Sequence, residues 1–67
     1  MLNKNVGNQI KHRRKALKIT QSDLAQLAKI ATNTLYKIER GQANPTMNVI
    51  EKITDILGLV VTLEVKK

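Results

Sequence analysis

Residues 20–41 read TQSDLAQLAKIATNTLYKIERG and contain two short helical patterns separated by a brief interruption. The first pattern begins at Thr20, because a threonine followed three residues later by Asp23 forms a capping box for the free amides of a new helix. Apolar residues, two of them alanines, follow between positions 24 and 28. Their small size lets another helix approach closely. Lys29-Ile30-Ala31 then interrupts the helical spacing.

The second pattern runs from about Thr32 to Arg40 and stops at Gly41, a residue type that favours helix C-termini. Its Leu35 and Ile38 face inward at helical spacing. The opposite face carries polar side chains that lie one turn apart, namely Thr32, Asn33, Tyr36 and Lys37. Such side chains suit the edges of DNA bases, since Asn pairs with adenine, Lys with guanine and Thr with the thymine methyl. A merely solvated helix face would also be polar.

Helical spacing continues on both sides of this segment. Upstream, a narrow apolar stripe with a basic flank predicts a first helix through Val6, Ile10, Arg13, Arg14 and Leu17. After a loop at residues 42–45, Thr46 caps a fourth helix, which Gly58 closes. The inward stripe of this helix comprises Val49, Ile50, Ile53, Ile56 and Leu57.

The last segment changes to a two-residue period. Four apolar residues, Leu59, Val61, Leu63 and Val65, alternate with Val60, Thr62 and Glu64, and β-branched side chains dominate. This pattern predicts a β-strand. No other segment resembles a strand, and an isolated strand cannot satisfy its own amides. We therefore expect it to pair with the same segment of a second chain in a homodimer. A frayed apolar tail and a fifth helix are the alternatives.

Composition narrows the class of partner. The chain has 67 residues, with 12 Lys and Arg against 5 Asp and Glu, one His and no Cys. One small domain of this charge attracts polyanions, which include nucleic acids, acidic membranes and acidic proteins. Single-strand and RNA-binding modules stack bases on aromatic side chains, but this chain has only one aromatic residue. Double-stranded DNA is therefore the better partner. No transmembrane or signal segment is evident, so we expect a cytoplasmic protein without a membrane partner.

The sequence offers little for catalysis. His12 lies in a basic run, and Ser22 has no base beside it. The glycines at positions 7, 41 and 58 are too far apart for a phosphate-binding loop. We therefore expect no enzyme activity, no metal and no cofactor.

The motifs Ile19-Thr20-Gln21-Ser22-Asp23-Leu24-Ala25, Thr34-Leu35-Tyr36-Lys37-Ile38-Glu39-Arg40-Gly41 and Asn44-Pro45-Thr46 occur together. In this arrangement they resemble the Cro/cI-type (XRE) family of bacterial and phage helix-turn-helix regulators, over roughly residues 6–57. The resemblance implies an all-α, lambda-repressor-like domain of four to five helices at residues 1–58. Residues 59–67 resemble the dimerisation strand of Hip-type antitoxins, which pairs with its mate across the dimer.

The resemblance also implies roles for matching residues. Gln21 corresponds to a glutamine that contacts phosphate and braces the helices. The positions that face the DNA are Thr32, Asn33, Thr34 and Lys37, with Tyr36 on the same face, and those that approach the backbone are Arg40, Gln42 and Asn44. Arg14 and Glu39 match a structural ion pair. The helical spacing supports this ion pair independently, because Glu39 lies on the inward edge of its helix and needs a cation there.

Two residues depart from the family pattern. Lys29 stands in the turn where the family favours glycine, and Ala31 stands where it favours a Ser or Thr cap. A lysine in a left-handed turn and a missing N-cap each lower the stability of the domain by about 1 kcal/mol. We expect the helix to begin at Thr32 with its own hydroxyl as cap, which would make that hydroxyl less available to bases.

These observations predict a sequence-specific DNA-binding repressor that binds a palindromic operator as a homodimer. The alternative is an antitoxin that also binds a toxin subunit. A third possibility is an interaction module whose basic face binds an acidic protein.

Overall fold

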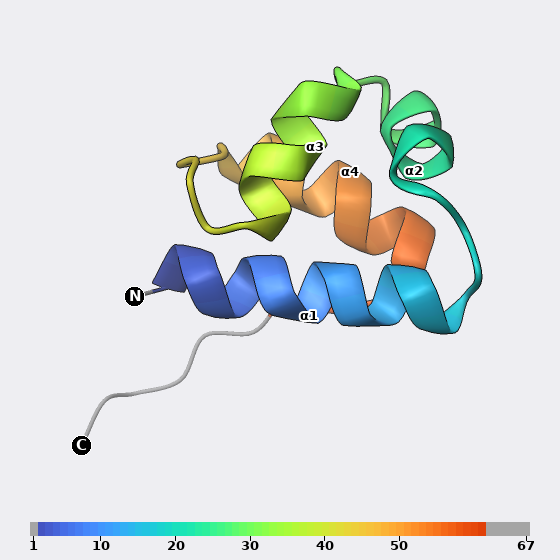
Figure 1. Ribbon diagram of the computed structural model, residues 1–67. Coiled ribbons are helices and arrows are strands. Elements are labelled where there is room, and N and C mark those ends of the chain that lie inside the picture. The colour runs from blue at the N-terminus through green and yellow to red at the C-terminus, as the bar shows by residue number, and fades with distance from the viewer. Residues whose placement is uncertain (1, 62–67) are drawn as a thin grey trace.

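The computed structural model describes the backbone of residues 2–61 and the side chains of residues 5–61. In this part of the chain the secondary structure is α1 (Leu2–Ala16), α2 (Gln21–Ala28), α3 (Thr32–Glu39) and α4 (Met47–Leu57). Figure 1 shows α1 lying along one side of the other three helices. The predicted all-α class is confirmed. Residues 59–61 have no regular secondary structure, and the rest of the predicted strand lies outside the described residues.

Side-chain caps begin two of the helices. At α2, the Asp23 amide donates to Thr20 Oγ1 at 3.0 Å, and the Thr20 amide donates to Asp23 Oδ2 at 3.3 Å, which confirms the capping box. At α4, the Val49 amide donates to Thr46 Oγ1 at 3.3 Å. The N-cap of α3 is Ala31, which has no side-chain cap, and Thr32 is already helical. The expectation that Thr32 caps α3 is therefore wrong.

In the described part of the chain, a residue in the left-handed conformation follows within two positions of the end of each helix. These residues are Lys18 (φ 60°), Lys29 (φ 58°), Gly41 (φ 74°) and Gly58 (φ 72°). In each case the next amide reaches back five residues to a helical carbonyl, as the Gln42 amide does to Lys37 O at 2.9 Å. This is the Schellman arrangement, which satisfies carbonyls that a helix end leaves open. A lysine in this conformation costs about 1 kcal/mol.

The first helix is displaced from its predicted bounds. It ends at Ala16, so Leu17 lies beyond it and is 41% exposed. The inward position predicted for Leu17 is therefore wrong. Leu17 keeps the helical spacing of the apolar residues, but the helix has already ended in the turn at residues 17–18, which the apolar pattern does not reveal.

Each helix contributes to one apolar core. The buried apolar residues are Ile10 from α1, Leu24, Ala25 and Ala28 from α2, Leu35 and Ile38 from α3, and Ile50, Ile53 and Leu57 from α4. Burying a Leu or Ile side chain stabilises a fold by about 1.5–3 kcal/mol. This packing compensates for the shortness of α2 and α3, because isolated helices of 8 residues are not stable in water.

Gly7 allows α1 to lie directly against the end of α3. A Cβ atom at this position would lie 2.8 Å from the carbonyl oxygen of Glu39 and closer still to that of Ile38. Both obstacles are backbone atoms, so a side-chain rotation cannot remove the overlap. Only glycine fits between these two helices.

We predict that Gly7→Ala destabilises the domain by about 1–3 kcal/mol, although alanine is the better helix former. The added methyl group must push α1 away from α3. Thermal unfolding followed by circular dichroism measures the effect. Asn8→Ala, at the exposed neighbour on the same helix, should leave the melting temperature nearly unchanged. Equal melting of Gly7→Ala and wild type would contradict the close contact.

Candidate nucleic-acid interface

A buried ion pair joins α1 to the end of α3. The Arg14 side chain donates from Nε to Glu39 Oε2 at 2.8 Å and from Nη2 to Glu39 Oε1 at 3.1 Å. Arg14 is 7% exposed and Glu39 is 3% exposed. Removal of either partner would leave a charge inside the protein, so the contact is a constraint on how the helices pack.

Two further hydrogen bonds extend this contact into a network. Arg14 Nη1 donates to the carbonyl oxygen of Ile19 at 2.9 Å, in the turn before α2. Gln21 Nε2 donates to Glu39 Oε1 at 2.9 Å, from the first turn of α2. Four parts of the chain thus meet in one network: Arg14 of α1 and Gln21 at the start of α2 donate to the carboxylate at the end of α3, and Arg14 also donates to the α1–α2 turn. This network helps to fix the orientation of α3 relative to α2.

Gln21 has a structural contact as well as its expected role at phosphate. Its bond to Glu39 uses one of the two N–H groups of the side-chain amide. The side chain is half-buried, at the start of α2. The helix-bracing part of its expected role is therefore visible as a direct hydrogen bond.

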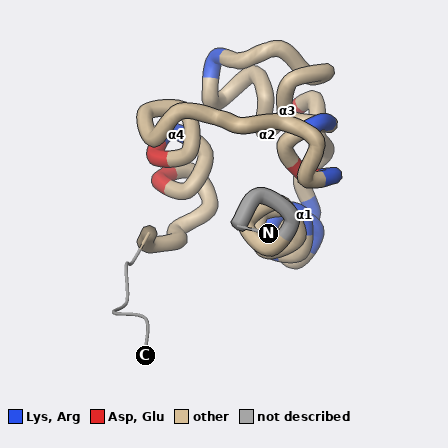
Figure 2. The backbone as a smooth tube through the Cα atoms, turned by 90° about the vertical axis from the view of Figure 1, so that its left-hand side faces the viewer, with Lys and Arg blue, Asp and Glu red and all other residues tan. Residues whose placement is uncertain are grey.

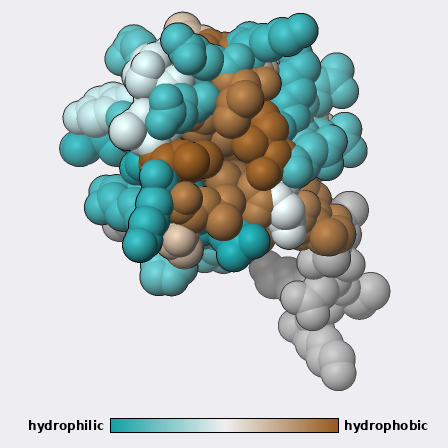
Figure 3. Space-filling view, turned by 90° about the vertical axis from the view of Figure 1, so that its right-hand side faces the viewer, coloured by the Kyte–Doolittle hydropathy of each residue, from teal (hydrophilic) through white to brown (hydrophobic). Residues whose placement is uncertain are grey.

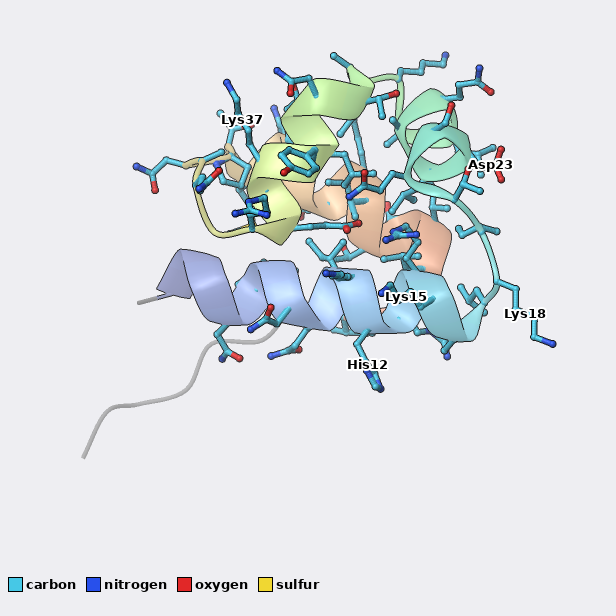
Figure 4. All side chains as sticks on the ribbon, viewed as in Figure 1. His12, Lys15, Lys18, Asp23 and Lys37 are labelled. Atoms are coloured by element: carbon cyan, nitrogen blue, oxygen red, sulfur yellow. The ribbon has the colours of Figure 1, made fainter. Side chains whose placement is uncertain are left out.

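The outward face of α3 has the composition expected from the sequence. Its exposed residues are Thr32, Asn33, Thr34, Tyr36 and Lys37, whereas Leu35 and Ile38 are buried. Figure 4 shows the Lys37 side chain projecting away from the body of the domain. The helix thus presents a polar ridge whose other side is anchored in the core.

The chain after α3 continues this polar surface. Arg40, Gln42 and Asn44 are all exposed. The Arg40 guanidinium lies over the ring of Tyr36, with 5.3 Å between its Cζ atom and the ring centroid. The end of α3 and the loop that follows it therefore place polar groups beside the positions that the sequence predicts to face bases.

Charge is unevenly distributed over the domain. Figure 2 shows lysine and arginine positions along α1 and α3, whereas acidic positions of α4 lie on the opposite side. The acidic residues of α4 are Glu51 and Asp55, which are exposed beside Lys52. A phosphate backbone would be attracted to the side that carries α1 and α3.

Two residues of the basic run lie away from this surface. Figure 4 shows His12 pointing to the side of α1 opposite α3. Arg13 is half-buried and donates from Nε to the carbonyl oxygen of Leu57 at 2.9 Å, at the end of α4. The sequence did not distinguish Arg13 from its neighbours. Its signal was its place in the apolar stripe of the first helix.

The residues predicted for dimerisation divide into three groups. Leu59 packs against the core of its own chain, and Val61 is 42% exposed. Leu63 and Val65 lie outside the described residues.

Among the described side chains there is no cluster of three or more His, Asp or Glu residues that could hold a metal ion. Within residues 2–61, none of the helices is both long enough and apolar enough to cross a bilayer.

Residues 10–62 match the helix-turn-helix family. The chain belongs to this family. Its members are DNA-binding regulators, and the family is not a class of enzymes. The match includes all of α2, α3 and α4, and it begins at Ile10, the residue of α1 buried in the core.

Curated relatives include two kinds of regulator. The chain is 39% identical over 57 residues to the immunity repressor protein of Bacillus phage phi105, covering 85% of this chain and 40% of the repressor. It is 35% identical over 53 residues to a candidate HTH-type transcriptional regulatory protein of Methanococcus maripaludis, covering 79% of this chain and 16% of that protein. The chain therefore spans less than half the length of these relatives.

We predict that Arg14→Ala lowers the free energy of unfolding by about 1–3 kcal/mol, because Glu39 would remain buried without its cation. In a domain of this size, each kcal/mol lowers the melting temperature by about 4–8 °C. Lys15→Ala removes the same charge from the exposed neighbour on α1 and should have little effect. If Arg14→Ala melts like wild type but loses DNA affinity, Arg14 acts on phosphate instead.

Proposed function

We propose that this chain is a transcriptional repressor that recognises a palindromic operator in double-stranded DNA as a homodimer. The observation that carries the proposal is the exposed polar face of α3, held on a core-anchored helix by the Arg14–Glu39 network. A recognition helix must project from a rigid support to enter the major groove. The likeness to a phage immunity repressor supports the regulatory role.

The exposed groups divide by the part of DNA that they would contact. The first turn of a recognition helix reaches the base edges, so Thr32 and Asn33 are placed to read bases, with Lys37 one turn later. Thr32 remains available for this role because Ala31, not Thr32, is the N-cap. Gln21, Arg40, Gln42 and Asn44 flank this centre and would contact phosphates, which position the protein but carry no sequence information.

The homodimer is supported by the apolar surface at the C-terminal end of the described chain. Val60 is 83% exposed and Val61 is 42% exposed. Figure 3 shows an apolar area of the surface that continues toward this segment. Small domains commonly gain stability from oligomerisation, and a second copy would remove these valines from water. Two-fold symmetry would also place two copies of α3 in successive major grooves, roughly 34 Å apart.

We predict that truncation after Leu59 converts a dimer into a folded monomer. The cut keeps Leu59 because this side chain packs on the core, and it removes the exposed valines together with the predicted strand. Sedimentation at micromolar concentration measures the oligomeric state, and circular dichroism shows whether the helices persist. A monomeric full-length chain under the same conditions would contradict the dimer.

We predict that Asn33→Ala and Lys37→Ala each weaken binding to the preferred site by about 1–3 kcal/mol and relax the preference at one or two positions per half-site. Gln21→Ala should weaken binding to all duplexes alike. Selection from a random DNA library with each variant measures the preferred motif. Lys52→Ala, which removes one positive charge from α4, is the matched control for Lys37→Ala.

Gln21→Ala also removes a hydrogen bond to Glu39, so binding should be measured well below its melting temperature. An unchanged motif for both α3 variants, combined with an altered motif for Gln21→Ala, would contradict the placement of α3 in the groove.

The second candidate function is that of an antitoxin that represses its own operon and binds a toxin subunit. The exposed apolar Val60 and Val61 fit this function as well as they fit a homodimer, because such a segment suits a protein partner or a second copy. A neighbouring gene for a kinase-like or nuclease-like toxin would distinguish the two functions, provided that its product co-purifies with this chain in a defined ratio.

A further inference from the structure

Tyr36 and Arg40 form a pair on the surface of α3. The two residues are separated by one helical turn, and the Arg40 Cζ atom lies 5.3 Å from the centroid of the Tyr36 ring. Tyr36 is 44% exposed, and Arg40 is also exposed. The contact is therefore made on the surface, without burial to force the side chains together.

We propose that Tyr36 is a positioning residue that holds the Arg40 guanidinium ready for a DNA phosphate, and that it does not read bases. The inference rests on the proposed DNA-binding function. It assigns to the ring of Tyr36 a role that its place on the base-facing side of α3 did not suggest. The chemistry it serves is a charge-assisted hydrogen bond from a guanidinium to a phosphate oxygen.

The position of Arg40 along α3 favours phosphate over a base edge. Arg40 is the C-cap of the helix, at the end opposite Thr32 and Asn33. Base edges are reached mainly from the first turns of a recognition helix, so its last residue lies toward the edge of the groove, where the sugar–phosphate backbone runs. The left-handed Gly41 then turns the chain away directly after this residue.

The cation–π contact explains what the ring contributes. A free arginine side chain loses considerable conformational entropy when it binds a phosphate. A guanidinium already lying on an aromatic ring has lost part of this freedom, while the N–H groups at its edge can still donate. The attraction arises from the face of the ring, so the tyrosine hydroxyl is not required.

Phenylalanine should therefore replace Tyr36 without loss, whereas leucine should not. Tyr36→Phe keeps the ring and removes the hydroxyl. Tyr36→Leu keeps apolar bulk and helix propensity but removes the ring. Arg40→Ala removes the group that the ring is proposed to hold. These three variants and the double variant Tyr36→Leu/Arg40→Ala separate the possible roles of Tyr36.

The experiment measures binding of each variant to the selected operator and to an unrelated duplex of equal length, by fluorescence anisotropy at several salt concentrations. We expect Tyr36→Phe to bind both duplexes within twofold of wild type. Tyr36→Leu should weaken binding to both by the same factor, about two- to fivefold, which is the effect expected of an exposed cation–π contact. In the Arg40→Ala background, Tyr36→Leu should have no further effect. Arg40→Ala should reduce the salt slope by about one.

Three outcomes would overturn the proposal. A changed operator preference in Tyr36→Phe would show that the hydroxyl reads a base. An equal loss from Tyr36→Leu with and without Arg40 would show that the ring acts independently of the guanidinium. If wild type binds no duplex at all, the proposed DNA-binding function fails and this inference fails with it. Melting temperatures of all variants, measured without DNA, separate these effects from unfolding.

Discussion

The ion pair between Arg14 and Glu39 is the constraint on which the rest of the domain depends. A carboxylate that is 3% exposed needs hydrogen-bond donors in place of water, and here three side-chain N–H groups supply them. Those donors come from α1 and from the start of α2, while the carboxylate comes from the end of α3. The carboxylate can be satisfied only when these helices are correctly oriented. The pair therefore couples local folding to the geometry that presents the outward face of α3.

The short helices are made possible by their ends and by close packing. α2 and α3 each have only 8 residues, so most of their backbone N–H and C=O groups lie in the first or last turn, where a helix leaves them without an internal partner. Left-handed residues close every helix, and Gly7 lets α1 meet the carbonyls at the end of α3. Lys18 and Lys29 adopt a conformation that glycine would adopt more easily. The hydrogen bonds they permit outweigh this local cost in the folded domain.

Much of the fold could be predicted from the sequence because its signals are local. The capping box at Thr20 and the cap at Thr46 depend on residues three positions apart, and both are present. The exposed face of α3 follows from helical spacing alone. The contacts of Gly7 and Arg13, in contrast, depend on which helix end comes to lie beside α1. Spacing within one helix contains no such information. The left-handed Lys18 was missed because lysine gives no local signal for that conformation.

The separation of charge described for α1, α3 and α4 gives the domain an electric dipole moment. Its positive end lies on the side of α1 and α3, and its negative end lies near Glu51 and Asp55. In the field of a polyanion, such a molecule experiences a torque before any atoms touch. Random collisions between two rigid bodies are mostly misoriented, which is why typical association is far slower than diffusion allows. With the proposed DNA partner, this dipole would increase the fraction of encounters in which the side carrying α1 and α3 faces the polyanion, and added salt would weaken this guidance.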